Sequence, residues 1–213
     1  MSLAALFSSE SPCLSFELFP PKTEAGERAL YKHVERLLEF SPDFITCTYG
    51  AGGSTQDKTL AIVSQVKAQF GLPVASHLTC VGSTREDLIR YLHTARDRGV
   101  DYIVALRGDS PKGELQYTAR PDGYANAAEL VSGLRKIADF EISVAGYPEM
   151  HPDSADLSAD LDNLKRKVDA GADAIITQMF FDANTYGAFL KACRKHGINV
   201  PVIPGIMLVQ AAG

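Results

Sequence analysis

Seven short apolar runs, each followed by a segment with helical periodicity, predict an α/β fold built on a parallel sheet. The alternation repeats about every 30 residues, which is the length of one βα unit. No stretch rich in proline or serine interrupts the chain, and a hydrophobic content of 46% is enough for one sizeable core. We therefore expect a single domain over residues 1–213, with helices packed on the sheet.

The expected strands are rich in β-branched and aromatic residues and end in polar residues or glycine. The first reads "CLSFELF" and the last reads "VPVIPGI". In chain order the strands cover residues 13–19, 43–49, 73–79, 101–107, 141–147, 173–181 and 200–206.

The helices between these strands carry apolar stripes and recognisable ends. In the first helix the stripe is formed by Leu30, Val34, Leu37 and Leu38. A later helix is expected to begin with a capping box of Ser83 and Glu86. It is expected to bury Leu88 and Leu92 and to end at Gly99.

Two arrangements of the sheet compete for such a chain. A doubly wound nucleotide-binding sheet carries a glycine-rich turn after its first strand, whereas this chain has "PPKT" there. The glycines of "GAGGST", after the second strand, do not match G-x-G-x-x-G. The sequence therefore favours a (β/α)8 TIM barrel, a fold of eight strands and about 250 residues, with seven strands present and the eighth missing.

Composition narrows the class of function. The net charge of −5 and the absence of a basic run argue against nucleic acid as a partner. The N-terminal "MSLAALFSSE" lacks the pattern of a signal peptide, and no apolar run is long enough to cross a bilayer. The four cysteines include no C-x-x-C pair, so no metal site is expected. We expect a cytoplasmic protein that acts on a small molecule, away from membranes.

Polar residues gather where the expected strands end, which is where a TIM barrel carries its chemistry. Glu17, His77 and Gln178 interrupt otherwise apolar runs, so solvated loops alone do not explain them. The whole set is Glu17, Thr48, Tyr49, His77, Arg107, Asp109, Tyr147, His151 and Gln178. Together these residues predict a functional site.

Each of these residues also has a structural interpretation that the sequence leaves open. Glu17 is either catalytic or a structural acid paired with Lys22 or Arg107. The histidine and the glutamine inside apolar runs are either site residues or interior groups satisfied by hydrogen bonds. Asp109, in "LRGDSP", is either a site residue or an ordinary turn residue.

The helix expected over residues 157–168 carries a polar stripe beside its leucines. Asp160, Asn163 and Lys167 follow one another at helical spacing. One interpretation is a solvent face with salt bridges. The other is a ligand edge for a dinucleotide, in which the carboxylate binds ribose hydroxyls and Lys167 with Arg166 binds phosphates.

Taken together, these segments resemble the bacterial type of methylenetetrahydrofolate reductase, the short form without a regulatory domain. The resemblance runs from about Ser15 to Met207 and rests on seven motifs in the same order and spacing. They read "FELFPPKT", "TCTYGAGGST", "ASHLTC", "ALRGDSP", "SVAGYPEMHP", "NLKRKVDAGADAIITQMFFD" and "VIPGIM".

The resemblance implies a flavoprotein oxidoreductase of one-carbon metabolism and methionine biosynthesis. Such an enzyme reduces 5,10-methylenetetrahydrofolate to 5-methyltetrahydrofolate, with NADH or NADPH as reductant and non-covalent FAD as cofactor. The implied partners are the folate and the nicotinamide, and a homo-oligomer is expected. The family binds FAD without a Rossmann fingerprint, in keeping with its absence from this sequence.

The resemblance also implies roles for individual residues. Glu17 matches the general acid that protonates N10 of the folate, and an apolar surround raises a carboxyl pKa in the direction this role requires. Asp109 matches an aspartate near the flavin and the pterin. Gln178 matches a glutamine that contacts folate and nicotinamide in turn, and Thr48 matches a contact on the nicotinamide side.

The implied cofactor contacts include the polar stripe of the helix over residues 157–168. Ser154 stands nearby, where the family has an alanine. The full set of cofactor contacts is Thr48, Tyr49, Ala51, His77, Arg107, Gly108, Asp109, Tyr124, Ala125, Tyr147, His151, Asp160, Asn163, Arg166 and Lys167.

The sequence departs from the family after "PGIM", since the helix after strand seven, the eighth strand and the final helix are missing. Strands one and seven are then expected to be open edges, with Glu17 beside the gap. Three interpretations follow. The first is a truncated form of an active reductase. The second is a flavin-binding protein without full activity, or a subunit completed by another chain. The third is a different barrel enzyme, such as a lyase with Lys22 as base.

Overall fold

Seven parallel strands alternate with helices along the chain. The computed structural model describes residues 6–7, 12–48, 56–109 and 118–207. The strands are β1 (Ser15–Leu18), β2 (Phe44–Cys47), β3 (Val74–Thr79), β4 (Tyr102–Leu106), β5 (Glu141–Gly146), β6 (Ala174–Thr177) and β7 (Val202–Ile203). The helices are α2 (Glu24–Leu37), η1 (Leu38–Phe40), α3 (Gln56–Phe70), α4 (Arg85–Asp97), α5 (Ala127–Ile137), α6 (Leu157–Asp169) and α7 (Ala183–Lys195).

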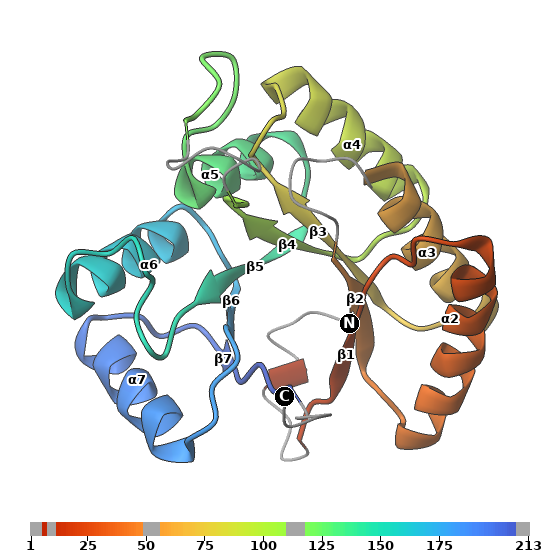
Figure 1. Cartoon of the computed structure of the whole chain (residues 1–213). Coiled ribbons are helices and arrows are strands. Elements are labelled where there is room, and N and C mark those ends of the chain that lie inside the picture. The colour runs from red at the N-terminus through yellow and green to blue at the C-terminus, as the bar shows by residue number, and fades with distance from the viewer. Residues whose placement is uncertain (1–5, 8–11, 49–55, 110–117, 208–213) are drawn as a thin grey trace.

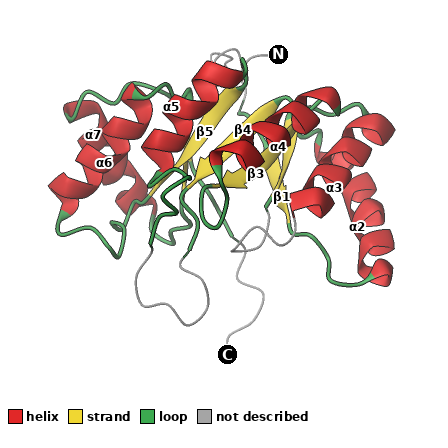
Figure 2. Ribbon diagram, turned by 90° about the horizontal axis from the view of Figure 1, so that it is seen from above, coloured by secondary structure: helices red, strands yellow, loops and turns green. Residues whose placement is uncertain are grey.

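The sheet follows the order of the chain from β1 to β7, and every neighbouring pair is parallel. Figure 1 shows the strands curling about a common centre, with α2 to α7 on the outside. At right angles to that view, the strands lie enclosed between helices on either side (Figure 2). This arrangement confirms the predicted TIM-barrel type, with seven strands in the described part of the chain and β1 and β7 at the ends of the sheet.

The apolar core has two parts. The larger fills the space between the strands and the helices and includes Val34, Leu92 and Ile142, none of which is exposed. The smaller lies inside the curl of the sheet, where the rings of Phe44 and Tyr102 meet edge to face at 5.7 Å. Burying apolar area on both faces of the sheet stabilises a parallel sheet, which is why its strands read as continuous apolar runs.

An aspartate before each even-numbered strand joins it to the strand before. Asp101 accepts from the N–H of Val74 at 2.9 Å and returns its own N–H to the Val74 carbonyl at 3.0 Å. Asp173 does the same with Ile142, at 2.7 and 2.8 Å. Asp43 makes the corresponding pair with the residue before β1, at 2.8 Å in both directions. These three clamps lie at the amino ends of the strands, opposite the ends where the polar residues gather.

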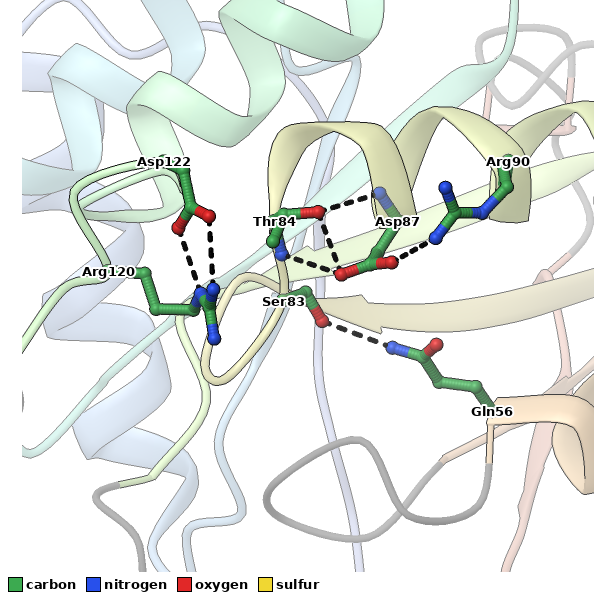
Figure 3. A network of polar contacts seen from close by, with 7 residues as sticks. All are labelled: Gln56, Ser83, Thr84, Asp87, Arg90, Arg120 and Asp122. Carbon is green, nitrogen blue, oxygen red and sulfur yellow. Dashed lines mark hydrogen bonds and ion pairs between the residues drawn. The ribbon is translucent and has the colours of Figure 1, made fainter.

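One helix start differs from the prediction. The capping box of α4 consists of Thr84 and Asp87, and not of Ser83 and Glu86. The Thr84 hydroxyl accepts from the N–H of Asp87 at 3.0 Å, and the Asp87 carboxylate accepts from the N–H of Thr84 at 3.0 Å. Ser83 is buried instead and accepts from Gln56 at 3.3 Å, as Figure 3 shows.

The other expected helical features are largely confirmed. Leu88 and Leu92 are fully buried, and Gly99 follows the end of α4 with φ of +75°. Leu157, the first residue of α6, is 48% exposed. Within the described part of the chain, every helix is too short or too polar to cross a membrane.

Candidate functional site

A cavity of about 780 Å³ lies at the carboxyl ends of the strands, bordered by the first turn of α5 and one face of α6. This volume is typical of small-molecule sites. Most of the residues that the sequence assigned to a site line it. They are Thr48, Arg107, Gly108, Asp109, Tyr147, His151, Asp160, Asn163, Arg166, Lys167 and Gln178.

Six predicted site residues are not in this lining. Tyr49 and Ala51 fall outside the described residues, so their predicted role is not addressed by the structure. The other four lie on β1, on β3 and before α5, and they are Glu17, His77, Tyr124 and Ala125.

The carboxylate of Asp160 is held in a fixed position at the base of the polar stripe. Its residue is only 8% exposed. The Ser154 hydroxyl donates to it at 2.9 Å, and the backbone N–H of His151 donates at 3.3 Å. Ser154, which replaces the expected alanine, therefore gives the loop before α6 an additional hydrogen bond to the helix.

Lys167 extends from α6 to the end of β5, where its ammonium donates to the carbonyl oxygen of Ala145 at 2.5 Å. Burial lowers the pKa of Lys167 to about 8, while the negative charge of Asp160 acts in the opposite direction. Arg166 donates to the side-chain oxygen of Asn163 one turn earlier. Asp160, Asn163, Arg166 and Lys167 all line the cavity, although Asn163 and Arg166 are exposed.

The segment after β4 approaches the neighbouring strand closely at Gly108. This glycine has φ of +89°, and a Cβ atom there would overlap Val81 and lie 3.1 Å from the Cβ of Thr79. Only glycine meets both demands without strain. Arg107, just before it, donates to Asp153 at 2.9 Å and so ties the end of β4 to the loop before α6.

Two aromatic rings form another part of the wall. The rings of Tyr147 and His151 meet edge to face, with centroids 4.5 Å apart and planes at 74°. The Nδ1 atom of His151 accepts from the backbone N–H of Asp153 at 3.0 Å. In the neutral ring this leaves Nε2 as the N–H donor.

Glu17 lies on β1, and its carboxylate is 4.0 Å from the Nε2 atom of His77 on β3. Partial burial raises the pKa of Glu17, although its side chain is still 43% exposed. His77 is buried, and burial lowers its pKa to about 4, so the ring is neutral near pH 7. Neither ring nitrogen of His77 hydrogen-bonds a group in the described part of the chain.

Asp109 and Gln178 face the same cavity from the segments that follow β4 and β6. Gln178 is exposed, so the interpretation as a satisfied interior amide is wrong. Its backbone N–H donates to the carbonyl of Gly146 at 2.7 Å, which fixes the chain at this point. A carboxylate and an amide are thus available to one ligand at the mouth of the barrel.

The sequence did not identify several residues that line the cavity. Thr79 ends β3, and Asp153 follows the histidine in "HPDS". The first turn of α5 contributes Asn126, Ala127, Ala128 and Glu129. Asn126 caps that helix by accepting from the N–H of Glu129 at 3.0 Å, so the N-x-x-E spacing was the available signal.

The donor set of the cavity fits an anionic dinucleotide. Two cations and a fixed carboxylate lie along α6, and Gly108 allows a ligand and the backbone to approach each other closely. At the other side, Asp109 and Gln178 can bind a polar heterocycle. Lys167, Arg166, Asp160, Asn163 and Gly108 are therefore the residues that would hold such a group.

Comparison with known proteins was made by sequence and by structure. The chain matches the family described as methylenetetrahydrofolate reductase over residues 2–213. The 5,10-methylenetetrahydrofolate reductase of Salmonella typhimurium is 45% identical over 197 residues, which cover 92% of this chain and 64% of that protein. Methylenetetrahydrofolate reductase (NADH) 1 of Arabidopsis thaliana is 44% identical over 207 residues, which cover 92% of this chain and 35% of that protein.

A solved structure supports the fold alone. An uncharacterized protein from Clostridium thermocellum, described as binding two copies of 5-methyl-5,6,7,8-tetrahydrofolic acid, aligns with a TM-score of 0.62 at 17% identity. The alignment covers 94% of this chain and 67% of that one.

Proposed function

Because the chain belongs to the methylenetetrahydrofolate reductase family, we propose that it takes part in the reduction of 5,10-methylenetetrahydrofolate to 5-methyltetrahydrofolate by NADH or NADPH, with FAD as cofactor. The chain spans 64% of the length of its bacterial relative from Salmonella, so the activity of the whole relative is itself part of the proposal. The observation that carries it is the cavity in which Lys167 and Asp160 face the same space as Asp109 and Gln178.

FAD is assigned to the α6 side of the cavity. Lys167 and Arg166 would bind the diphosphate, and Asp160 with Asn163 would bind ribose hydroxyls. When bound, FAD supplies the hydride transfer between nicotinamide and folate. The chain's own residues bind the cofactor, orient the two substrates in turn and exclude water.

Glu17 is assigned the role of general acid toward the folate. Partial burial raises the pKa of Glu17, the direction that a proton donor requires, and the neutral ring of His77 adds no positive charge that would oppose this. Asp109 is assigned to the stabilisation of positive charge on the folate, and Gln178 and Thr48 to contacts with folate and nicotinamide.

A narrower function is the second candidate. The 43% exposure of the Glu17 side chain favours a chain that binds FAD and accepts hydride from NADH but turns over folate poorly, because water around a carboxyl lowers its pKa. A second chain that covers Glu17 would restore the shielding. We further propose a single cytoplasmic domain that forms a homo-oligomer.

The two candidates are separated by assaying each half of the reaction. Purified chain loaded with FAD is given NADH or NADPH and a quinone acceptor, and then methylenetetrahydrofolate in place of the quinone. Oxidation with both acceptors supports the full reaction, and oxidation with the quinone alone supports the narrower one. If neither assay shows oxidation and no flavin binds, both candidates are wrong.

A further inference from the structure

The family resemblance predicts that Tyr124 contacts the cofactor, but the ring of Tyr124 lies in a different environment. Its ring does not line the cavity and packs instead against the core between the sheet and the helices. Two elements hold it there. One is the start of α4, through Arg85, and the other is the middle of α5, through Gly133.

Gly133 makes room for the phenol of Tyr124. A Cβ atom at this position would overlap the Oη and Cζ atoms of Tyr124 and lie 2.8 Å from its Cε1 atom. Glycine in the middle of a helix costs stability relative to alanine, so its use here requires a reason. The close approach of the ring to the backbone of α5 provides that reason.

Arg85 covers the other side of Tyr124 and fixes the residues before it. Its guanidinium carbon lies 5.3 Å from the centroid of the ring, within the range of a cation–π contact. Its Nε donates to the carbonyl of Gly123 at 3.2 Å, and its backbone N–H donates to the carbonyl of Asp122 at 2.9 Å. One residue of α4 therefore contacts three consecutive residues of the loop before α5.

The loop is also stiffened from within. Arg120 forms a bidentate pair with Asp122, at 2.9 and 3.0 Å, next to the capped start of α4 (Figure 3). The backbone N–H of Gly123 donates to the carbonyl of Arg120 at 3.0 Å. Planar bidentate pairs have well-defined geometry, so this pair favours the observed turn beside α4, although both side chains are about half exposed.

The chain runs directly from this anchored ring into the cavity wall. Ala125 follows Tyr124, and its N–H donates to the carboxylate of Glu129 at 3.0 Å. Asn126 then caps α5, and Asn126, Ala128 and Glu129 line the cavity. A displacement of Tyr124 is therefore transmitted to the wall through one residue.

We propose that Arg85, Tyr124 and Gly133 form a lock that positions the first turn of α5, with Tyr124 acting as a positioning residue and not as a ligand contact. The consequence for FAD rests on the proposed function, since the positioned turn is a wall of the cavity assigned to the cofactor. The position of the turn itself does not depend on that assignment.

The lock is tested first in the chain without ligand, by amide hydrogen exchange. The reporters are the amides of Ala125, Glu129 and Leu130, each of which is hydrogen-bonded within the cap. Gly133→Ala is expected to accelerate their exchange at least about tenfold relative to the amides of α2, because the ring must leave its site. The matched control is Gly187→Ala in α7, where an added Cβ meets nothing within 4 Å.

A milder pair of variants covers the case in which Gly133→Ala does not fold. Arg85→Met removes the cation over the ring and keeps an unbranched side chain. Arg90→Met, on the same helix, removes an exposed arginine that pairs with Asp87. Only the first is expected to accelerate exchange at Ala125 and Glu129. The double variant Gly133→Ala with Tyr124→Ala is expected to exchange at these amides no faster than Tyr124→Ala alone. Without the ring, the added Cβ at position 133 no longer overlaps anything at that place.

Amide exchange tests the lock, and FAD titration separately tests whether the positioned turn is a wall of the cofactor site. Unchanged exchange at the three reporters in both Gly133→Ala and Arg85→Met, or equal acceleration in the control variants, overturns the lock. FAD titration by flavin fluorescence follows, and the lock variants are expected to weaken binding at least about tenfold while the controls match the wild type. Faster exchange with unchanged affinity overturns the claim that the turn is a cofactor wall. If the wild type binds no FAD, the proposed function is contradicted. The amide exchange data, which are measured without ligand, still test the lock in that case.

Discussion

Lys167 lies in an environment unlike that of an ordinary surface lysine. Its folded pKa of about 8 lies below the usual value of 10.5, so the folded state binds its proton less tightly than the unfolded state does. Below pH 8 the buried ammonium of Lys167 is charged and lowers the free energy of unfolding. As the pH rises from about 8 to 10.5, the folded state loses this proton before the unfolded state does, and the free energy of unfolding increases. A phosphate near the ammonium would offset this cost.

The first prediction concerns this lysine in the chain without ligand. The unfolding free energy of the wild type, minus that of Lys167→Met, is expected to rise by up to about 3 kcal/mol between pH 8 and pH 10.5. Urea unfolding at a series of pH values measures it. Lys165→Met, whose lysine pairs with Asp169 on the outer side of α6, is the control and should show no such difference. A flat difference for Lys167→Met would contradict the buried charge.

The second prediction concerns Glu17. Glu17→Gln is expected to bind FAD and to allow its reduction by NADH, but to lose reduction of the folate, because an amide cannot deliver the proton. Stopped-flow measurement of the two half-reactions tests it, with Glu35→Gln on the exposed face of α2 as control. In the wild type, the folate step should slow as the pH rises through the raised pKa of Glu17. Equal damage to both half-reactions would remove the acid assignment.

The sequence was most informative for residues that stand out in their own strand. Glu17, His77 and Gln178 break apolar runs; Gln178 lines the cavity, while Glu17 and His77 lie 4.0 Å from each other on β1 and β3. Tyr124 shows the limit of this approach. Its packing depends on Gly133 and Arg85, which come from two other elements, and such an arrangement leaves no local pattern.

At the scale of single elements, the start of α4 shows how two similar patterns compete. Both Ser83 with Glu86 and Thr84 with Asp87 have the spacing of a capping box. The tertiary structure selects the second pair, because Ser83 is buried and bonded to Gln56 on α3. A contact between two helices cannot be inferred from the spacing in one of them.

The third prediction follows from the observed cap. Thr84→Ala is expected to lower the free energy of unfolding by about 1 kcal/mol, because the amide of Asp87 loses its acceptor. Glu86→Ala alters the capping box predicted from the sequence, Ser83 with Glu86, and should change the free energy of unfolding by less than about 0.5 kcal/mol. Thermal or urea denaturation of the two variants compares them. The reverse order would restore the original assignment.

The fourth prediction concerns the clamps before the even-numbered strands. Asp173→Ala is expected to lower the free energy of unfolding by about 2 kcal/mol, because the N–H of Ile142 and the guanidinium of Arg135 both lose an acceptor. Asp169→Ala, four residues earlier and exposed, should cost less than about 0.5 kcal/mol. Chemical denaturation gives both values. A loss in Asp173→Ala no larger than that in the control would show that the clamp contributes nothing.

At the scale of the whole molecule, the order of strands and helices followed from the alternation of apolar runs and helical stripes. All seven expected strands are present, although each is shorter than its apolar run. The run from residue 173 to 181 becomes a strand of four residues, because the chain turns toward the cavity at Gln178. Strand ends that serve a site leave the sheet early, and hydrophobicity does not mark that point.

The same geometry explains why one fold-level prediction located much of the site. Parallel strands in sequence order bring all their carboxyl ends to one side of the curled sheet. Residues as distant in sequence as Thr48 and Gln178 therefore line one cavity. The first turn of α5 was missed, because a helix start contributes to the site through its cap and not through a polar residue in a strand.

The fifth prediction is that this cavity binds FAD. The measurement is a titration of the purified chain with FAD, followed by flavin absorbance and fluorescence, for the wild type, Lys167→Met and Lys165→Met. We expect saturable binding by the wild type and by Lys165→Met, and at least about tenfold weaker binding by Lys167→Met, because the buried ammonium proposed to bind phosphate is lost. Wild-type chain that binds no FAD, or equal affinity in all three proteins, would contradict it.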